Sequence, residues 1–176
     1  MKNKGVVLLI VFIAGLLAVV AMLSKSHEVP VKKAAVGLSA PAFQLTDTEG
    51  RTWDLSSLKG KVVLLNFWAS WCDSCKEENP SLQALVNSEK GNERFVFASV
   101  LYKDEPSTAI EYMKKNGIDF PLLIDNKNVS SAYGLTGVPE TFVIDKKGIV
   151  REKIIGPIKW DTPEIRAAID KLISEN

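Results

Sequence analysis

The sequence predicts an α/β fold in which helices flank both faces of a central mixed sheet. The first observation is the apolar run Val62–Ala69, which only Asn66 interrupts, as expected of a strand buried on both faces. The second is the alternation of strand-like and helix-like segments along the chain. The third is that the only two cysteines, Cys72 and Cys75, stand directly after the apolar run, where a helix should begin.

Each further element has its own signal. Residues 43–46 and 51–54 alternate around a Thr-Glu-Gly turn, which predicts an N-terminal β-hairpin. The first helix, at 73–88, contains Pro80, which should bend it. The elements expected next are a strand at 95–100, a helix capped by Ser107 and stopped by Gly117, a short strand at 121–124 and a helical turn or two through Tyr133.

The C-terminal part predicts a hairpin followed by a helix. Residues 141–145 and 149–155 flank a Lys-Lys-Gly turn, which is a strong antiparallel signal. Thr162 and Pro163 open the last helix. Its expected apolar face consists of Ile165, Ala168, Ile169, Leu172 and Ile173.

The N-terminus predicts a single transmembrane helix. Lys2 and Lys4 precede nineteen uncharged residues, Gly5–Leu23. As a helix this segment would be about 28 Å long, close to the thickness of the hydrocarbon core of a membrane. Val19 and Ala21 form only a weak cleavage site, so an uncleaved signal anchor is favoured over a cleaved signal peptide.

We therefore expect three parts. Residues 1–23 form the signal anchor, residues 24–36 an exposed extracytoplasmic tether, and residues 37–176 the folded domain. The positive-inside rule does not settle the orientation, since Lys25, Lys32 and Lys33 lie on the other flank of the anchor. A short N-terminal stub with a long domain after the anchor should nevertheless place that domain on the periplasmic side of the inner membrane.

Composition argues against several classes of function. The chain carries 22 Lys and Arg against 21 Asp and Glu, with no basic stripe that would bind nucleic acid. Zinc needs about four ligands, and the single histidine, His27, lies far from the cysteines in the tether. Lys76 occupies the position where a haem-attachment motif requires histidine. We expect no metal and no cofactor other than a redox-active disulfide.

The cysteine pair itself predicts redox chemistry. Two thiols separated by two residues close into a disulfide with little backbone movement and exchange two electrons as a unit. Cys72 would lie at the helix N-terminus, where free N–H groups favour a thiolate. Cys75, one turn inside, would be shielded and act as the resolving thiol.

Three motifs carry a resemblance to a known family. They are the segment from Asn66 to Cys75 (NFWASWC-x-x-C), Pro80 five residues later, and the segment from Gly137 to Asp145 (GVPETFVID). Together they resemble the thioredoxin-fold thiol-disulfide oxidoreductases of the membrane-anchored ResA/CcmG (DsbE)/TlpA group, over roughly residues 37–175. The resemblance implies a thioredoxin-like fold with a central insertion near residues 100–133.

The resemblance also implies a substrate-binding edge. Pro139 should follow a cis peptide bond from Val138, in a loop that faces the cysteines and pairs with an extended substrate. Trp71 should shield the disulfide face. Glu140 follows the proline, so substrate contact and a solvated loop charge both stay open. Trp68, Tyr102 and Tyr133 are expected to pack in the core or at its rim, and Trp53 and Trp160 carry no signal beyond packing.

Two polar positions differ from ordinary thioredoxins. Asn66 stands where thioredoxins carry a buried aspartate, and an amide cannot take a proton from the resolving thiol. Glu78, three residues after Cys75, lies on the same helix face and is the replacement candidate for proton transfer; the alternative is a solvated surface glutamate. Asp73 puts a negative charge beside Cys72, which should destabilise its thiolate and favour a reducing couple.

The expected function is that of a membrane-anchored, extracytoplasmic reductant. Through the resemblance, its client would be an apocytochrome c whose C-x-x-C-H cysteines are reduced before haem attachment, with electrons from a transmembrane thiol carrier. Alternatives are a reductase for copper-chaperone or other exported thiols, or a non-catalytic binding or chaperone module. A peroxiredoxin-like peroxidase is disfavoured, because no P-x-x-x-[TS]-x-x-C pattern ends at Cys72.

Overall fold

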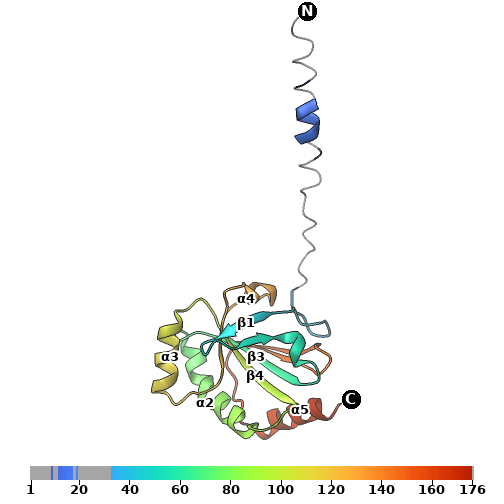
Figure 1. Ribbon diagram of the computed structural model, residues 1–176. Helices are drawn as coiled ribbons and strands as arrows, with labels where there is room; N and C mark the ends of the chain where they lie inside the picture. Colours follow the sequence, from blue (N-terminus) through green and yellow to red (C-terminus); the bar gives the residue numbers. More distant parts are fainter. Residues whose placement is uncertain (1–8, 10–11, 18, 20–32, 176) are drawn as a thin grey trace, which may run out of the picture. The chain divides into compact units, whose positions relative to one another are not determined.

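The structure is a computed structural model, and it describes residues 9, 12–17, 19 and 33–175. Figure 1 shows the domain, in which a twisted sheet lies between helices. The strands are β1 (Gln44–Asp47), β2 (Thr52–Asp54), β3 (Val62–Trp68), β4 (Phe95–Leu101), β5 (Leu122–Ile124), β6 (Glu140–Ile144) and β7 (Val150–Ile155). The helices are the 3-10 helix η1 (Leu55–Leu58), α2 (Asp73–Ser88), α3 (Pro106–Lys115), α4 (Val129–Ala132) and α5 (Pro163–Ser174).

The sheet is mixed, as predicted. Its strand order is β2-β1-β5-β4-β3-β6-β7. β3 runs parallel to β4, and β4 runs parallel to β5. β6 pairs antiparallel with both β3 and β7, while β1 and β2 form the predicted N-terminal hairpin. β3 therefore lies inside the sheet with neighbours on both sides, which explains its unbroken burial.

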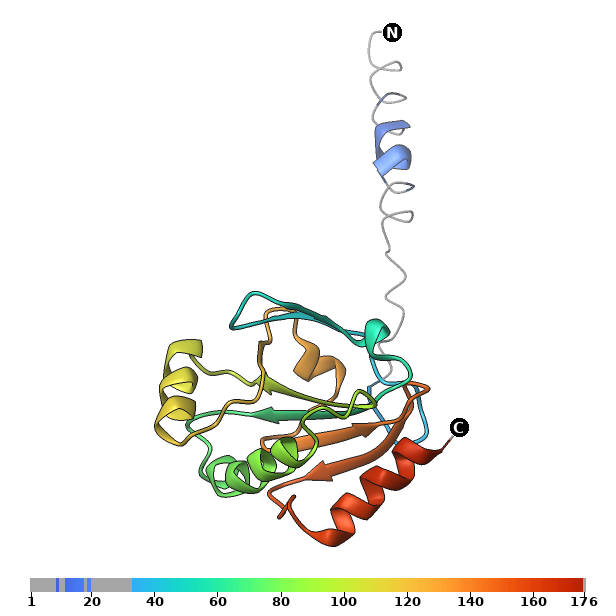
Figure 2. The ribbon, with the colours of Figure 1, turned by 60° about the horizontal axis from the view of Figure 1, so that its bottom comes forward.

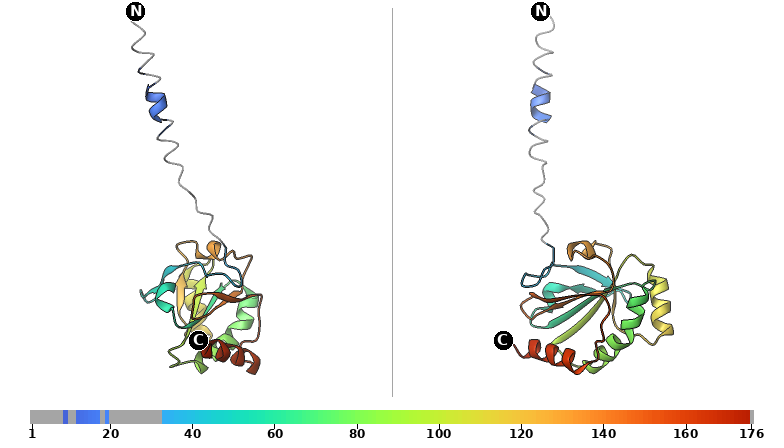
Figure 3. Two further views of the ribbon diagram at one scale, coloured as in Figure 1. Left: turned by 90° about the vertical axis from the view of Figure 1, so that its right-hand side faces the viewer. Right: turned by 180° about the vertical axis from the view of Figure 1, so that it is seen from behind.

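Successive residues of β3 point to opposite faces of the sheet. Val62, Leu64 and Trp68 belong to one core cluster, which they share with residues of α2, α3 and α5. The residues between them, Val63, Leu65 and Phe67, belong to a second cluster with residues of α4. We call these the α2 face and the α4 face, and Figures 2 and 3 show α2 with α5 on the opposite side of the sheet from α4. Asn66 has the parity of the α2 face.

Aromatic side chains build the core on the α4 face. The ring of Tyr133 lies 5.5 Å from that of Phe67 and 4.9 Å from that of Phe142. Its hydroxyl donates a hydrogen bond to the carbonyl oxygen of Pro41 at 2.9 Å. Burial raises the pKa of Tyr133, so the phenol stays neutral. Tyr133 and Trp68 are core residues, as predicted, and Tyr102 is half-buried at the rim.

Three local predictions need correction. α3 begins at Pro106 with Glu105 as its N-cap, and not after Ser107, because proline suits the first turn of a helix. The 3-10 helix η1, capped by the side chain of Asp54, was not predicted. In α5, Ala168 is exposed although the rest of the predicted face packs inward.

Most of the predicted anchor and tether, residues 1–23 and 24–36, lies outside the described residues. Residues 12–17 are helical. Within the described part of the chain, no helix is both long and apolar enough to span a membrane. This segment belongs to a unit separate from the domain, so the two are described independently.

Candidate active site

Cys72 and Cys75 form a disulfide at the N-terminus of α2, with their Cα atoms 5.3 Å apart. Cys72 is the N-cap residue, and its Sγ accepts a hydrogen bond from the backbone N–H of Cys75 at 3.1 Å. β3 ends four residues earlier, so the strand delivers the pair to the edge of the sheet. Cys72 is 6% exposed and Cys75 is fully buried, an order of accessibility that favours Cys72 as the sulfur open to attack.

The loop before β6 faces the disulfide. The carbonyl oxygen of Val138 lies 3.5 Å from Sγ of Cys72, and the bond between Val138 and Pro139 is cis, as the resemblance implied. The backbone N–H of Gly156, just after β7, donates to the carbonyl oxygen of Pro139 at 2.9 Å. The first contact places Val138 beside Cys72, and the second ties Pro139 to the residue after β7.

Trp71 stands at the surface next to the disulfide. It is 55% exposed, and its indole N–H donates to the carbonyl oxygen of Lys103 at 3.1 Å. The backbone N–H of Ser70 donates to the carboxylate of Asp104 at 2.6 Å. The loop after β4 thus fixes the segment before Cys72, while more than half of the Trp71 side chain remains exposed.

Asp73 is not an isolated negative charge. Its carboxylate pairs with the ammonium group of Lys76 at 2.8 Å. The hydrogen bond from Lys76 lowers the pKa of Asp73, and the same contact raises the pKa of Lys76. Because the charges of Asp73 and Lys76 nearly cancel, Asp73 destabilises the Cys72 thiolate less than an unpaired carboxylate would.

Glu78 is buried, so the alternative of a solvated surface glutamate is wrong. The residue is 2% exposed. Its Oε1 accepts a hydrogen bond from Nδ2 of Asn66 at 2.9 Å, and its Oε2 accepts from the indole N–H of Trp160 at 3.2 Å and from the backbone N–H of Ile158 at 3.4 Å. Burial raises the pKa of Glu78, although these hydrogen bonds oppose the shift.

The parity of the strands explains how Asn66 meets Glu78. Asn66 points to the α2 face of the sheet, which α2 covers. Its Nδ2 also donates to Oγ1 of Thr141 on β6 at 2.9 Å. Asn66 therefore orients the Glu78 carboxylate from the sheet side and links it to β6, the strand that follows the 138–139 loop.

Trp160 is a site residue that the sequence did not reveal. It was expected only to pack, yet its indole N–H reaches Glu78. Trp160 lies in the segment after the last strand, which leads from Gly156 and Pro157 toward α5 and contacts Glu78 and Ser81 of α2. A single sequence does not indicate that a tryptophan there would meet a residue of α2.

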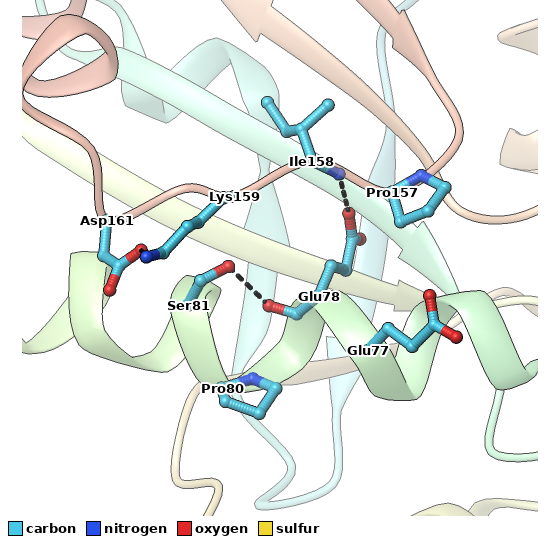
Figure 4. Close-up of a pocket in the computed structure, with 8 residues that line it drawn as sticks. All are labelled: Glu77, Glu78, Pro80, Ser81, Pro157, Ile158, Lys159 and Asp161. Atoms are coloured by element: carbon cyan, nitrogen blue, oxygen red, sulfur yellow. Dashed lines mark hydrogen bonds and ion pairs between the residues drawn. The ribbon is translucent and has the colours of Figure 1, made fainter.

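A pocket of about 520 Å³ lies against Glu78, between α2 and the segment 157–161. Figure 4 shows the Glu78 carboxyl pointing toward Ile158 of that segment. The lining residues are Glu77, Glu78, Pro80, Ser81, Pro157, Ile158, Lys159 and Asp161. The pocket gives water an approach to a carboxyl that is otherwise enclosed by protein.

Neither of the two roles considered for Glu140, substrate contact or a solvated loop charge, agrees with the structure. Its side chain is fully buried, so it is neither a solvated loop charge nor exposed to a substrate. It accepts hydrogen bonds from the backbone N–H of Thr136 at 2.7 Å and of Gly137 at 3.3 Å, and it pairs with Lys153 at 3.1 Å. Burial would raise the pKa of Glu140, but the contacts with Thr136 and Lys153 outweigh it and lower the pKa.

Taken together, these groups can perform dithiol–disulfide exchange. Among the described residues, no three His, Cys, Asp or Glu side chains are grouped so as to hold a metal ion. The disulfide supplies a two-electron couple. The buried carboxyl group of Glu78 on α2 can hold a proton. The backbone of the 138–139 loop can form hydrogen bonds with an extended peptide.

Comparisons with known proteins agree with this chemistry. The model of the AhpC/TSA family matches residues 36–153. The thiol-disulfide oxidoreductase ResA of Bacillus thuringiensis (strain Al Hakam) is 39% identical over 71% of this chain and 72% of its own. The thiol:disulfide interchange protein DsbE of Pseudomonas fluorescens biotype C is 35% identical over 80% of this chain and 79% of its own. A crystal structure of a thiol:disulfide interchange protein from Chlorobium tepidum TLS has a TM-score of 0.68 and 27% identity, covering 80% of this chain and 99% of that one.

Proposed function

Because the chain belongs to the AhpC/TSA family and is a thiol-disulfide oxidoreductase of the ResA and DsbE type, we propose that it works as a reductant of disulfides in exported proteins. The observation that carries this proposal is the buried Glu78 on the same helix as Cys75. A reductant must deprotonate its resolving thiol, and a carboxylate with a raised pKa accepts a proton more readily than a solvated one.

The exchange proceeds in two displacements. In the reduced protein the Cys72 thiolate attacks one sulfur of a client disulfide, and the other client sulfur leaves as a thiolate that takes a proton from solvent. Cys75 then gives its proton to Glu78 and attacks Sγ of Cys72. The second client sulfur leaves, the Cys72–Cys75 disulfide closes, and the client gains the two electrons that the pair loses.

The surroundings of Cys72 suit a peptide substrate. The backbone carbonyl of Val138 lies beside Cys72, and the loop of Val138 and Pro139 can pair with an extended client segment. The exposed indole of Trp71 adds apolar contact on the other side of Cys72. Both assignments are part of this proposal.

We further propose where the protein acts and on what. Residues 1–23 anchor it in the inner membrane, residues 24–36 tether it, and the domain of residues 37–176 works on the periplasmic side. The client is apocytochrome c with oxidised C-x-x-C-H cysteines, and a transmembrane thiol carrier restores the reduced pair. Protease added to spheroplasts should digest the domain, and protection of the domain would contradict this topology.

Trapping tests the proposal directly. A full-length Cys75→Ser variant keeps the attacking thiol but lacks the resolving one, so each client should remain on Cys72 as a mixed disulfide. The matched control is Cys72→Ser, Cys75→Ser, which should capture nothing. Recovery of apocytochrome c supports the assigned client, and recovery of copper-chaperone proteins favours the alternative reductase. A variant that binds clients only without covalent linkage favours the non-catalytic binding module.

A further inference from the structure

We propose that Lys103 and Asp104, in the connection between β4 and α3, are positioning residues: they hold the Trp71 indole in a fixed orientation beside Cys72, where a client peptide binds. This inference rests on the proposed function, in which the exposed indole contacts the client. Neither residue needs to touch the client, because both act through Trp71 and the segment before Cys72.

The segment between β3 and α2 is a tight turn. Trp68 is the last residue of β3, and the backbone N–H of Cys72 donates to the carbonyl oxygen of Ala69 at 3.2 Å. Ser70 and Trp71 lie inside this turn, outside the strand registers that pair β3 with β4 and β6. Because β3 has already ended, the orientation of the turn depends on contacts from other parts of the chain.

Two hydrogen bonds from the turn end on the connection between β4 and α3. The backbone N–H of Ser70 donates to Oδ2 of Asp104 at 2.6 Å. The indole N–H of Trp71 donates to the carbonyl oxygen of Lys103 at 3.1 Å. The other carboxylate oxygen of Asp104 accepts from the backbone N–H of Glu105 at 2.8 Å, which ties this side chain to the N-cap of α3. One short loop thus holds both the backbone and the side chain of the turn.

Lys103 adopts a backbone conformation that lysine rarely takes. Its φ is +45°, in the left-handed region, where the β-carbon is crowded by the backbone. Core packing does not impose this conformation, because the Lys103 side chain is exposed and its ammonium group lies 5.0 Å from the centre of the Tyr102 ring. A pocket of about 330 Å³ lies between this loop and α4, so the loop is not pressed into shape from that side. The contacts with Ser70 and Trp71 are what the strained conformation serves.

The indole held in this way is open to a client. Trp71 is more than half exposed. Its neighbour Cys72 takes its position from α2, because Sγ of Cys72 caps the helix by accepting from the N–H of Cys75. The contacts from Lys103 and Asp104 therefore bear on client binding, while the reactivity of Cys72 depends on α2. A ring that is already fixed loses less freedom when a client docks, which strengthens binding.

The experiment measures exchange by the reduced full chain with two oxidants. One is the small aromatic disulfide 5,5′-dithiobis(2-nitrobenzoate), which reports the reactivity of Cys72 alone. The other is a synthetic peptide with one internal C-x-x-C disulfide, which must also bind beside Trp71. For Asp104→Ala we expect the apparent KM for the peptide to rise about fivefold, because the indole is no longer fixed. The maximal rate and the small-disulfide rate should stay within about twofold of the wild type.

Rescue by conservative variants separates positioning from a general loss of structure. Asp104→Asn keeps an oxygen that accepts from Ser70, so its KM for the peptide should stay within about twofold of the wild type. Lys103→Gly keeps the carbonyl and adopts a positive φ without strain, so its KM should also stay within about twofold. Glu105→Ala is the matched control and should leave KM unchanged, because it removes an exposed carboxylate of the same loop that does not cap α3.

A double-mutant cycle tests whether both contacts act on one ring. Trp71→Phe keeps an aromatic ring but loses the N–H that the Lys103 carbonyl binds, so KM should again rise about fivefold. If Asp104 acts through this ring, the double variant Asp104→Ala, Trp71→Phe should also show a rise of about fivefold. Independent contacts would multiply to roughly 25-fold. Hydrogen exchange adds a structural readout, since the amide proton of Ser70 should lose protection in Asp104→Ala and keep it in Asp104→Asn.

The outcomes separate this inference from the proposed function. An unchanged KM in a folded Asp104→Ala overturns the positioning role, and so does a multiplicative rise in the double variant. If Asp104→Ala does not fold, an unchanged KM in Trp71→Phe overturns the role instead. A Cys75→Ser variant that forms no mixed disulfide with the peptide removes the proposed function, and this inference with it. A trapped peptide with unchanged KM values removes this inference alone.

Discussion

Asn66 donates a hydrogen bond to the carboxylate of Glu78 at 2.9 Å, and both side chains are buried on the α2 face of the sheet. The Asn66 amide on β3 and the Glu78 carboxyl on α2, the helix that also carries Cys75, thus meet in one enclosed site between strand and helix. Asn66 cannot take a proton, but it orients the group that can. Trp160 binds the other carboxylate oxygen, so Glu78 is held from two sides.

We expect Glu78→Gln to slow the resolving step. The variant cannot accept the proton of Cys75, so the rate of client release should fall about tenfold or more. Its pH profile should become that of a thiol alone, because the coupled titration of thiol and carboxyl is lost. Stopped-flow measurement of mixed-disulfide resolution from pH 5 to 9 checks both effects. If Glu78→Gln resolved the mixed disulfide at the wild-type rate across that pH range, water and not Glu78 would be the acceptor of the Cys75 proton.

The fold should tolerate this change at a modest cost. The amide of glutamine accepts at one atom only, so one of the three donors to Glu78 is left without a partner, at about 1–3 kcal/mol. Removal of a buried charge offsets part of that cost. We expect a net loss of less than about 2 kcal/mol in urea unfolding of the oxidised protein, and complete loss of folding would contradict this modest cost.

Glu78 and Glu140 should shape the pH dependence of stability in opposite directions. The folded pKa of Glu78 is raised, so its stabilising protonated state is present below the unfolded pKa of about 4.3 and is lost as pH rises through the folded pKa. The folded pKa of Glu140 is lowered, so its contribution is present above that value and is lost as pH falls. Urea unfolding across pH should show Glu78→Gln flattening the decline on the neutral side. The variant Glu140→Gln, Lys153→Met should flatten the fall of the free energy of unfolding at acid pH. If instead the Glu78 variant changed the acid side and the Glu140 variant the neutral side, both predicted directions would be wrong.

The ion pair between Asp73 and Lys76 should tune the redox potential of the couple by a small amount. Lys76→Gln leaves the negative charge of Asp73 unpaired near Cys72, destabilises the thiolate and should make the potential more negative. Asp73→Asn should shift it in the opposite direction, and the double variant should return close to the wild type. Each shift should stay below about 30 mV, because both charges are exposed and screened by salt.

Equilibration with a glutathione redox series checks these shifts. The wild-type couple should lie well to the negative side of about −120 mV, the value of a strongly oxidising periplasmic oxidase. A value near that figure would rule out the reductant. Shifts of the same sign in both single variants would show that the ion pair does not act through charge.

Trp160→Phe should raise the pKa of Glu78 further. The variant removes the indole donor to Oε2 while keeping an aromatic ring in the core, so the ionised carboxylate loses one of its stabilising contacts. The pH profile of resolution should therefore move to higher pH. Trp53→Phe is the matched control, since the Trp53 indole donates to Asp47 on the N-terminal hairpin, and it should leave the profile in place.

The sequence by itself determined most of the strands and helices and the redox pair. The strand at 62–68 and the helix at 73–88 follow from local periodicity and from residues that begin or end helices, which need no partner elsewhere in the chain. Cys72 and Cys75 are three positions apart, so their pairing at the helix start is also a local property. Helical spacing also made Glu78 the candidate for proton transfer, since it places the residue on the face of Cys75, but the sequence left open whether its side chain is buried or solvated.

Only the tertiary structure decided how charged and polar groups meet across the chain. Trp160 reaches Glu78 from 82 positions away, and Lys153 reaches Glu140 from the neighbouring strand. Burial of a carboxylate depends on such partners, because the cost of removing a charge from water is met only by donors that folding brings to it. Glu140 therefore looked like a loop residue free to touch a substrate, whereas packing of β6 between β3 and β7 encloses it.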